Sequence, residues 1–395
     1  NVVVVHHGGG LATCYAHLGG FVVEERAPVV EGALLGFVGS TGRSSGPHLH
    51  FEVRVHGSPV DPLVYLPDTV PYEPRRQGQH NAVWAESIYL RGHDPKKPRR
   101  VLNDGEFQAL ARRLEANDIR YVYLFAGPYD GHGGVPAYAM SETARASVRR
   151  LRQLVPDVVL LPWVGGLQHR TVHLEDPQWV ARAIEETARL VETLDVPGVH
   201  VDFEFIVPEA TYVRRERNLP DTNEGLHEYG ARHVAFTRAL RERLPQAFLS
   251  VVIPSTSGHV RPWKQKHSVE EAATLATLVD QIALMHYDTS IADGAVFAAS
   301  LDEQLRHVAD WRARSASART QFLLAVGTFV NARPLRHHRH LDVEGLEHYL
   351  PAIDAAIART QRDVRLVDGL AVYCDWTTKD VDWRRFRRLW TAGAH

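Results

Sequence analysis

Three histidines near the start of the chain have the side chains and the spacing for metal or acid–base chemistry. His48 and His50 are two residues apart, and His17 lies further upstream. Because side chains alternate along a strand, His48 and His50 would point to the same face of one. Two imidazoles on one face form a corner of a zinc or acid–base site. At that spacing alone, an exposed surface pair is the commoner outcome.

A second set of ionisable residues lies near the middle of the chain. His200, Asp202 and Glu204 alternate with two valines and a phenylalanine. On a strand, these three polar residues would share one face and the apolar residues the other. Burying three ionisable groups together is costly unless they are paired or functional. The pattern favours a functional site, and a structural network of ion pairs is the alternative.

The residues around the first three histidines predict a small all-β domain over residues 1–66. Its short apolar runs lie at residues 2–5, 21–23, 34–38 and 49–55. Glycine-rich turns separate these runs, and no helical period is present. Residues 67–80 are polar and rich in proline, which predicts a linker. The chain opens on an apolar run with no initiator Met and no signal peptide, so we expect a truncated N-terminus.

Residues 81–395 predict a single (β/α)₈ (TIM) barrel. The strand candidates are residues 83–90, 121–125, 158–163, 199–205, 248–254, 282–287, 322–327 and 370–374. The helix candidates are residues 106–115, 142–154, 177–194, 226–244, 269–279, 302–313 and 343–360. Ser141 and Asp176 stand where helix N-caps belong. A doubly wound open sheet is the alternative, but no glycine-rich phosphate turn follows the first strand. Catalytic groups of such barrels lie at the C-terminal strand ends, where Asp202 and Glu204 fall.

Composition limits the possible partners. The chain has 395 residues, with 45 Lys and Arg against 47 Asp and Glu. No basic run stands apart from the acidic residues, so nucleic acid is not expected as a partner. No stretch approaches ~18 unbroken apolar residues, so we expect no membrane span. Cys14 and Cys374 lie outside any Cys-x-x-Cys pair and are expected to behave as small apolar residues.

The segments around the first three histidines closely resemble the lysostaphin-type zinc endopeptidases, which cut peptides of the bacterial cell wall. The resemblance covers essentially all of residues 1–66. It is carried by residues 29–63 and includes Tyr-Ala-His-Leu at residues 15–18. It implies that His50 is a zinc ligand. It also implies that His48 and His17 polarise the water and stabilise the oxyanion, as water attacks a peptide carbonyl with help from the metal.

The same resemblance predicts an incomplete zinc site. The family also binds zinc through a His-x-x-x-Asp segment, which lies upstream of the matched region. We therefore expect residues 1–66 to be the C-terminal part of the domain, with one zinc ligand and no peptidase activity. Zinc is the expected cofactor of the complete domain only. Metal analysis after dialysis should find no stoichiometric zinc, and one tightly bound zinc per chain would contradict this expectation.

Residues 82–390 resemble the chitinase-like glycoside hydrolases of family eighteen. Gly198–Glu204 is similar to their Asp-Gly-x-Asp-x-Asp-x-Glu signature. Met285–Asp288 is similar to their motif at the sixth strand, and Trp376 to their eighth-strand tryptophan. Enzymes of this family use the acetamido oxygen of the sugar itself as the nucleophile.

This second resemblance implies a role for each matched residue. Glu204 would be the general acid and base, with a pKa raised by apolar neighbours. Asp202 would orient the acetamido N–H and stabilise the oxazolinium ion. Tyr287 would hydrogen-bond the acetamido oxygen, Asp288 would help hold the sugar, and Trp376 would form the stacking floor.

Three positions depart from the family pattern. Pro197 and His200 replace the first and the middle Asp, and Trp163 stands where a small Ser is usual. We expect His200 to contribute to substrate binding through an ion pair with Asp202, so that activity falls as His200 loses its proton near or above neutrality. The alternative is a neutral, hydrogen-bonded His200 in the barrel floor.

Together these patterns predict a two-domain bacterial cell-wall hydrolase that is secreted, periplasmic or attached to the wall. Its partner would be peptidoglycan or another glycan that contains N-acetylglucosamine, because peptidoglycan carries both the peptide and the glycosidic bonds. Two alternatives stay open. One is a non-catalytic glycan-binding barrel that brings the peptidase to the wall, and the other is a glycosidase acting on chitin or N-glycans.

Overall fold

The computed structural model contains two compact units, residues 1–72 and residues 73–395, which are taken separately. The structure describes residues 1–30, 33–44, 46–62, 65, 80–168, 170–204, 226–260, 267–314, 320–329, 339–360 and 366–391. The predicted linker, residues 67–80, lies outside the described residues except for His80. The predicted domain boundaries at residues 66 and 81 therefore stay predictions.

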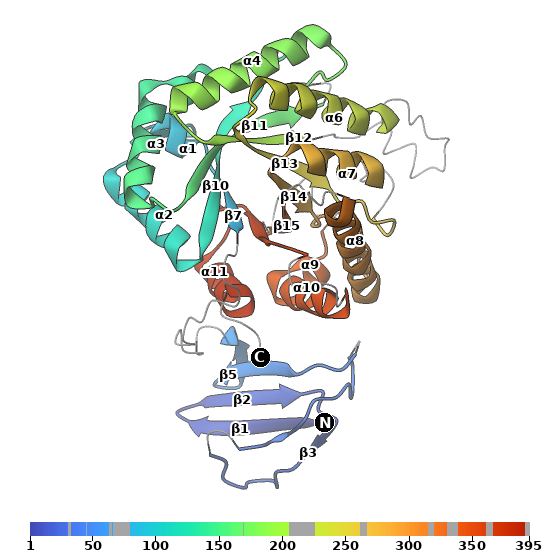
Figure 1. The fold of residues 1–395 in the computed structure, drawn as a ribbon. Coiled ribbons are helices and arrows are strands. Elements are labelled where there is room, and N and C mark those ends of the chain that lie inside the picture. The colour runs from blue at the N-terminus through green and yellow to red at the C-terminus, as the bar shows by residue number, and fades with distance from the viewer. Residues whose placement is uncertain are drawn as a thin grey trace. The chain divides into compact units, whose positions relative to one another are not determined.

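The first unit is built on an antiparallel sheet with the strand order β1-β2-β5-β6, so the all-β prediction is confirmed (Figure 1). Its strands are β1 (Val2–Gly8), β2 (Leu11–Ala16), β5 (His50–Val55) and β6 (Ser58–Val60). A separate pair is formed by β3 (Gly20–Phe21) and β4 (Gly36–Phe37). Between β1 and β2, Gly9 and Gly10 have φ of 59° and 80°, a region that glycine enters without steric cost. The buried apolar residues of this unit are Ala12, Cys14, Ala16, Leu18 and Val53.

In the second unit, eight parallel strands close into a barrel, as the sequence predicted (Figure 1). In barrel order they are β7 (Asn81–Ala85), β10 (Ile119–Pro128), β11 (Val159–Leu167), β12 (Gly198–Glu204), β13 (Phe248–Pro254), β14 (Gln281–Met285), β15 (Gln321–Gly327) and β16 (Gly369–Tyr373). The barrel closes where β16 pairs with β7. All eight strands therefore end at the same rim of the barrel.

Helices surround the barrel and follow its strands in sequence (Figure 1). The longer ones are α2 (Asp104–Ala116), α3 (Glu142–Leu154), α4 (Pro177–Leu194), α6 (Leu226–Arg243), α7 (Val269–Leu278), α8 (Gly294–Arg314) and α10 (Leu346–Thr360). The short elements are α1 (Ile88–Arg91), β8 (His93–Asp94), β9 (Lys97–Val101), a 3₁₀ turn (Ala137–Met140), α9 (Leu341–Glu344), α11 (Asp380–Phe386) and a π-helical turn (Arg387–Thr391). The predicted N-caps form, since Ser141 accepts the N–H of Ala144 and Asp176 that of Gln178.

Two predicted elements differ from the structure. The predicted strand 83–90 ends at Ala85, and Ile88–Arg91 forms α1 instead, because a short apolar run fits a strand or a buried helical turn equally well. The predicted helix 343–360 is divided at Gly345, which has extended φ and ψ of −65° and 149°. This break makes α9 a separate turn of helix, with Glu344 as its last residue.

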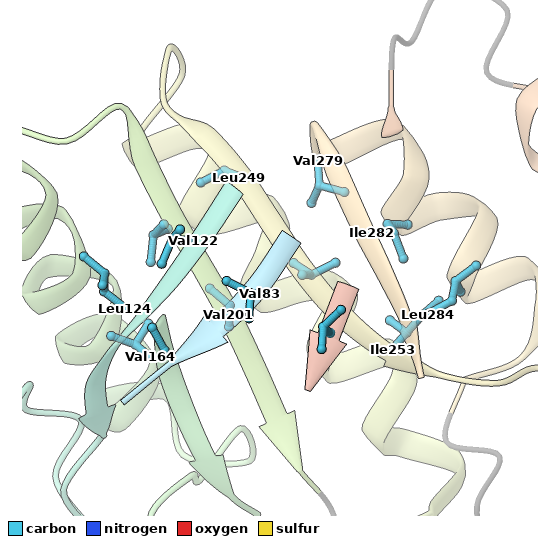
Figure 2. Packing of buried hydrophobic residues seen from close by; sticks show 14 of the residues in the cluster. Val83, Val122, Leu124, Val164, Val201, Leu249, Ile253, Val279, Ile282 and Leu284 are labelled. Atoms are coloured by element: carbon cyan, nitrogen blue, oxygen red, sulfur yellow. The ribbon is translucent and has the colours of Figure 1, made fainter. Parts of the chain in front are cut away.

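The barrel strands pack apolar residues on both faces. One cluster joins outward-facing strand residues to the helices, and Figure 2 shows Val122, Leu124, Val164 and Val201 among its members. A second cluster contains no helical residue and fills the barrel interior, with Trp84, Tyr123, Leu161 and Trp163 among its members. This is the layered packing of a filled barrel rather than a pore. Polar residues on the inner face must therefore be bonded to one another or lie at the rim.

Candidate active site at the rim of the barrel

A buried hydrogen-bond network lies inside the barrel. The hydroxyls of Tyr123 and Ser250 both donate to Oε1 of Gln281, at 2.5 and 2.8 Å. Nδ1 of His200 lies 2.8 Å from the Ser250 hydroxyl oxygen. Because the Ser250 hydroxyl proton is directed to Gln281, its oxygen must accept from Nδ1–H of His200. The His200 ring also stacks on Tyr123, with centroids 3.6 Å apart and planes at 8°.

His200 is consequently a neutral residue of the barrel floor. Its side chain has no exposed surface, and burial lowers its pKa well below the ordinary value of 6.5. The predicted ion pair with Asp202 is wrong, because among the described residues His200 bonds to Ser250 instead. The physical reason is that the cost of burying an imidazolium exceeds what Asp202, one layer nearer the rim, could offset.

We expect His200→Asn to lower the free energy of unfolding by about 1–3 kcal/mol, because a buried hydrogen bond and a stacked ring are lost. The folded-state pKa is depressed, so the unfolded chain binds the proton more readily. The advantage of wild type over the variant is then present above about pH 6.5 and shrinks below it. Urea unfolding at about pH 8 and about pH 5 measures both effects. A difference that grows on acidification would mean that His200 is charged in the fold.

Two carboxylates end β12 at the rim. Asp202 is buried, with 5% of its surface exposed, and pairs in register with Gly165 of β11. Glu204, the last residue of the strand, is exposed and pairs with Leu167. The apolar enclosure expected around Glu204 is therefore not observed in the described part of the chain, because the residue lies beyond the filled interior. Glu204 can exchange a proton with solvent from this position.

Two tyrosine rings face these carboxylates. Tyr287 follows β14 and Tyr373 ends β16, and their rings stack with centroids 5.9 Å apart and planes at 14°. Burial raises the pKa of Tyr287 well above its ordinary value, and the Tyr373 hydroxyl adds to this. Three carboxylates raise the pKa further: Asp202, Asp288 and Glu204. The hydroxyl of Tyr287 therefore stays protonated at neutral pH and is available as a hydrogen-bond donor.

The sequence analysis missed Tyr373. The pKa of its hydroxyl is raised by burial and by the same three carboxylates, so Tyr373 belongs to the group at the rim. The alternation of faces along the strand 369–373 could have indicated it. Ala371 belongs to the interior cluster and Val372 to the outer one. The alternation places Tyr373 on the inner face. It is the last inward residue of its strand, which is where barrel sites are built.

The two tryptophans singled out in the sequence, Trp376 and Trp163, differ in exposure. Trp376 is 40% exposed, and its ring centroid lies 5.9 Å from that of Tyr373. Trp163 is buried, with its centroid 4.5 Å from Phe125 and 6.4 Å from Tyr373. Trp163 thus fills the interior beneath the rim, in the layer of the neutral His200, with which it is in register. Trp376 is placed where a sugar ring could stack on it.

In the first unit, the three predicted histidines lie together. The ring centroid of His17 is 4.8 Å from that of His48 and 5.5 Å from that of His50. Nδ1 of His17 contacts the Thr41 carbonyl and Nδ1 of His48 the Gly46 carbonyl, both at 2.8 Å. Because a carbonyl only accepts, each Nδ1 atom donates and carries a proton, and in the neutral ring Nε2 is then the acceptor. That tautomer suits proton transfer.

The described residues do not complete a zinc site. Nε2 of His50 lies 2.8 Å from Oε1 of Glu52, and Arg54 contacts Oε2 of the same carboxylate. The hydrogen bond from His50 and then that from Arg54 lower the pKa of Glu52. Among the described residues, no group of three His, Cys, Asp or Glu side chains could hold a metal ion. The described residues of this unit therefore do not fit a zinc ion.

Comparison with known proteins identifies the first unit. Residues 1–62 match the model of Peptidase family M23. The chain is 53% identical over 68 residues to the DD-carboxypeptidase/endopeptidase Mpg of Neisseria meningitidis serogroup B, covering 17% of this chain and 16% of that protein. It is 43% identical over 63 residues to the peptidoglycan DD-endopeptidase ShyA of Vibrio cholerae, covering 16% and 15%. The chain thus spans about a sixth of the length of these relatives.

The second unit is similar in structure to a chitinase from Chromobacterium violaceum. The TM-score is 0.50 at 11% identity, and the match covers 78% of this chain and 98% of the chitinase. At that identity the likeness shows the fold alone. The chain therefore joins a unit that matches Peptidase family M23, at residues 1–62, to a barrel with the same fold as this chitinase. None of the helices in the described ranges is long and apolar enough to cross a membrane.

Proposed function

We propose that the barrel is a glycosidase that cleaves N-acetylglucosaminyl linkages with retention of configuration. The observation that carries this proposal is the convergence of Asp202, Glu204 and Tyr287 at one rim of a closed parallel barrel. A carboxylic acid, a second carboxylate and a protonated phenol are the groups that substrate-assisted hydrolysis needs. Tyr373 and Trp376 supply aromatic surface beside them.

In the first step, Glu204 donates its proton to the glycosidic oxygen as the bond to the anomeric carbon breaks. The acetamido oxygen of the same sugar attacks that carbon and forms an oxazolinium ion. Asp202 accepts the acetamido N–H and stabilises the positive charge. The Tyr287 hydroxyl hydrogen-bonds the acetamido oxygen and holds it in line for attack, while Asp288 holds the sugar.

In the second step, the Glu204 carboxylate takes a proton from water, and the water oxygen attacks the anomeric carbon. The acetamido group returns to its original form, and the sugar leaves with its configuration retained. Two displacements at the same carbon account for the retention. The exposed position of Glu204 lets the water reach it.

For the whole protein we propose hydrolysis of peptidoglycan outside the cytoplasm. Peptidoglycan contains both peptide and N-acetylglucosaminyl bonds. The names of two M23 relatives refer to carboxypeptidase and endopeptidase activity, in one case on peptidoglycan. His17 and His48 are the acid–base pair we propose for the complete peptidase, with His50 as a zinc ligand. Their tautomers and their proximity support these assignments.

The deciding experiment incubates the full chain with chitin oligomers, purified peptidoglycan and N-glycans. We expect new reducing ends on the first two substrates, and nuclear magnetic resonance should show the retained anomer first. Binding to these glycans without any new reducing ends would instead favour the glycan-binding barrel. Cleavage of N-glycans alone would overturn the wall assignment.

A further inference from the structure

A buried carboxylate lies directly behind the proposed sugar-binding segment. Glu344, at the end of α9, has only 1% of its surface exposed. Its Oε2 accepts the backbone N–H of Asp288, and its Oε1 accepts the backbone N–H of Thr289, both at 2.8 Å. The Thr289 hydroxyl also donates to Oε1. Three donors from two adjacent residues thus converge on one carboxylate.

These donors make the ionised form of Glu344 the one that fits. A backbone N–H can only donate, so each carboxylate oxygen must accept. Burial raises the pKa of Glu344 above its ordinary value, and the bonds from Thr289 and Asp288 and the charge of Arg339 limit that rise. Hydrogen bonds to an ionised carboxylate are about twice as strong as neutral ones. A neutral amide in place of Glu344 would turn an N–H₂ group toward one of the two backbone donors.

The segment that Glu344 holds has a backbone in need of support. Asp288 has φ of 56° and Ser290 has φ of 62°, both in the left-handed region. Residues other than glycine persist there when surrounding contacts hold them, and such residues cluster at functional sites. Asp288 directly follows Tyr287, so the conformation of Asp288 sets the direction of both side chains. The bonds from Glu344 are placed to hold that conformation.

Arg339 connects the same region to the end of β15. Its Nη1 donates to the Phe329 carbonyl at 2.7 Å, and its Nη2 donates to the Gly327 carbonyl. The guanidinium lies 4.6 Å from the centroid of the Phe329 ring. That ring lies 6.0 Å from the ring of Tyr287. Asp288 and Thr289 after β14, and Gly327 and Phe329 at the end of β15, are therefore bonded to one buried anion and one buried cation, respectively.

We propose that Glu344 is a positioning residue that fixes Tyr287 and Asp288 in the geometry that binds the sugar. This inference rests on the proposed function of those two residues. Glu344 lies 56 residues beyond Asp288 in sequence and touches the site through backbone amides. It acts on substrate through that segment.

The test compares Glu344→Gln with a matched control, Asp368→Asn. Oδ2 of Asp368 accepts the backbone N–H of Phe322 at 2.8 Å and a guanidinium proton of Arg312, at the opposite end of the barrel. We expect Glu344→Gln to lower kcat/KM on a chromogenic chitin oligomer at least tenfold. The kcat/KM of Asp368→Asn should stay within twofold of wild type, although the melting temperature should fall in both variants. Equal losses of kcat/KM would overturn the proposal.

A double-mutant cycle separates positioning from general destabilisation. In an Asp288→Ala background, Glu344→Gln should lower kcat/KM by a much smaller factor than it does in wild type. The effects of two substitutions are not additive when the two residues act as one unit. Additive losses would show that Glu344 does not act through Asp288. If Glu344→Gln fails to fold, Thr289→Val can replace it, because this change removes the hydroxyl donor to Glu344. Thr289→Val should lower kcat/KM by a smaller factor, and its effect should likewise not add to that of Asp288→Ala.

Hydrogen exchange tests the inference independently of turnover. The backbone amides of Asp288 and Thr289 should exchange faster in Glu344→Gln than in wild type. Their exchange rates in Asp368→Asn should equal those of wild type. If wild type cleaves no glycan, the proposed function fails, and the same variants are then compared for affinity to a chitin oligomer. Unchanged exchange at the two amides overturns the positioning role whatever the activity.

Discussion

Glu204→Gln is expected to lower kcat on chitin oligomers by about 10²–10⁴-fold, the range lost when a general acid is removed. The amide has nearly the shape of the carboxylic acid but has no proton to give to the leaving oxygen. Because the change is small and Glu204 is exposed at the strand end, folding should be unaffected. Initial rates measure the loss, and calorimetric titration should show oligomer affinity within a few-fold of wild type.

Glu303→Gln is the control for that experiment. Glu303 accepts the Ser257 hydroxyl at 2.7 Å and the backbone N–H of Gly258 at 2.8 Å, so it is also a hydrogen-bonded carboxylate of the barrel unit. Glu303 is not among the main causes of the raised pKa of Tyr287 or of Tyr373, and we expect the kcat of Glu303→Gln to equal that of wild type. A Glu204→Gln enzyme as fast as this control would place the acid elsewhere, with Asp288 as the next candidate.

Asp202→Asn is expected to lower kcat by about 10²–10³-fold, the effect of removing one preorganised electrostatic partner of a charged transition state. The oxazolinium ion is positive, and Asp202 is a buried carboxylate beside two protonated phenols. An amide can still contact the acetamido group but supplies no charge. KM should therefore change less than kcat, because the charge develops only as the bond breaks.

A change of substrate tests the same step without mutation. An oligomer of glucose has no acetamido group, so wild type should cleave it more slowly than a chitin oligomer by about the same 10²–10³-fold. Asp202→Asn should then affect the glucose oligomer little. Rapid cleavage of the glucose oligomer by wild type would show that the sugar does not assist, and that a protein carboxylate attacks the anomeric carbon instead.

Much of the fold could be predicted because it depends on local pattern. Short apolar runs between amphipathic helical stretches predicted the barrel strands, and Ser141 and Asp176 marked helix starts through bonds to residues three and two positions away. The end of the predicted strand, residues 88–90, was wrong because three apolar residues fit a strand and a helical turn alike. The faces of β12 were predictable for the same reason, since its side chains alternate whatever lies around them.

The partners of the site residues were decided by tertiary structure. The sequence by itself placed His200, Asp202 and Glu204 on one face, and from adjacency alone an ion pair between His200 and Asp202 was expected. In the closed barrel, β13 brings Ser250 beside His200, and complete burial favours the neutral ring over a charged one. Glu344, the last residue of α9, accepts the backbone N–H of Asp288 across 56 residues of sequence, a contact that no spacing along the chain indicated. Spacing along a chain determines which side chains share a face, whereas solvent exclusion and contacts between distant segments determine their charge and their partners.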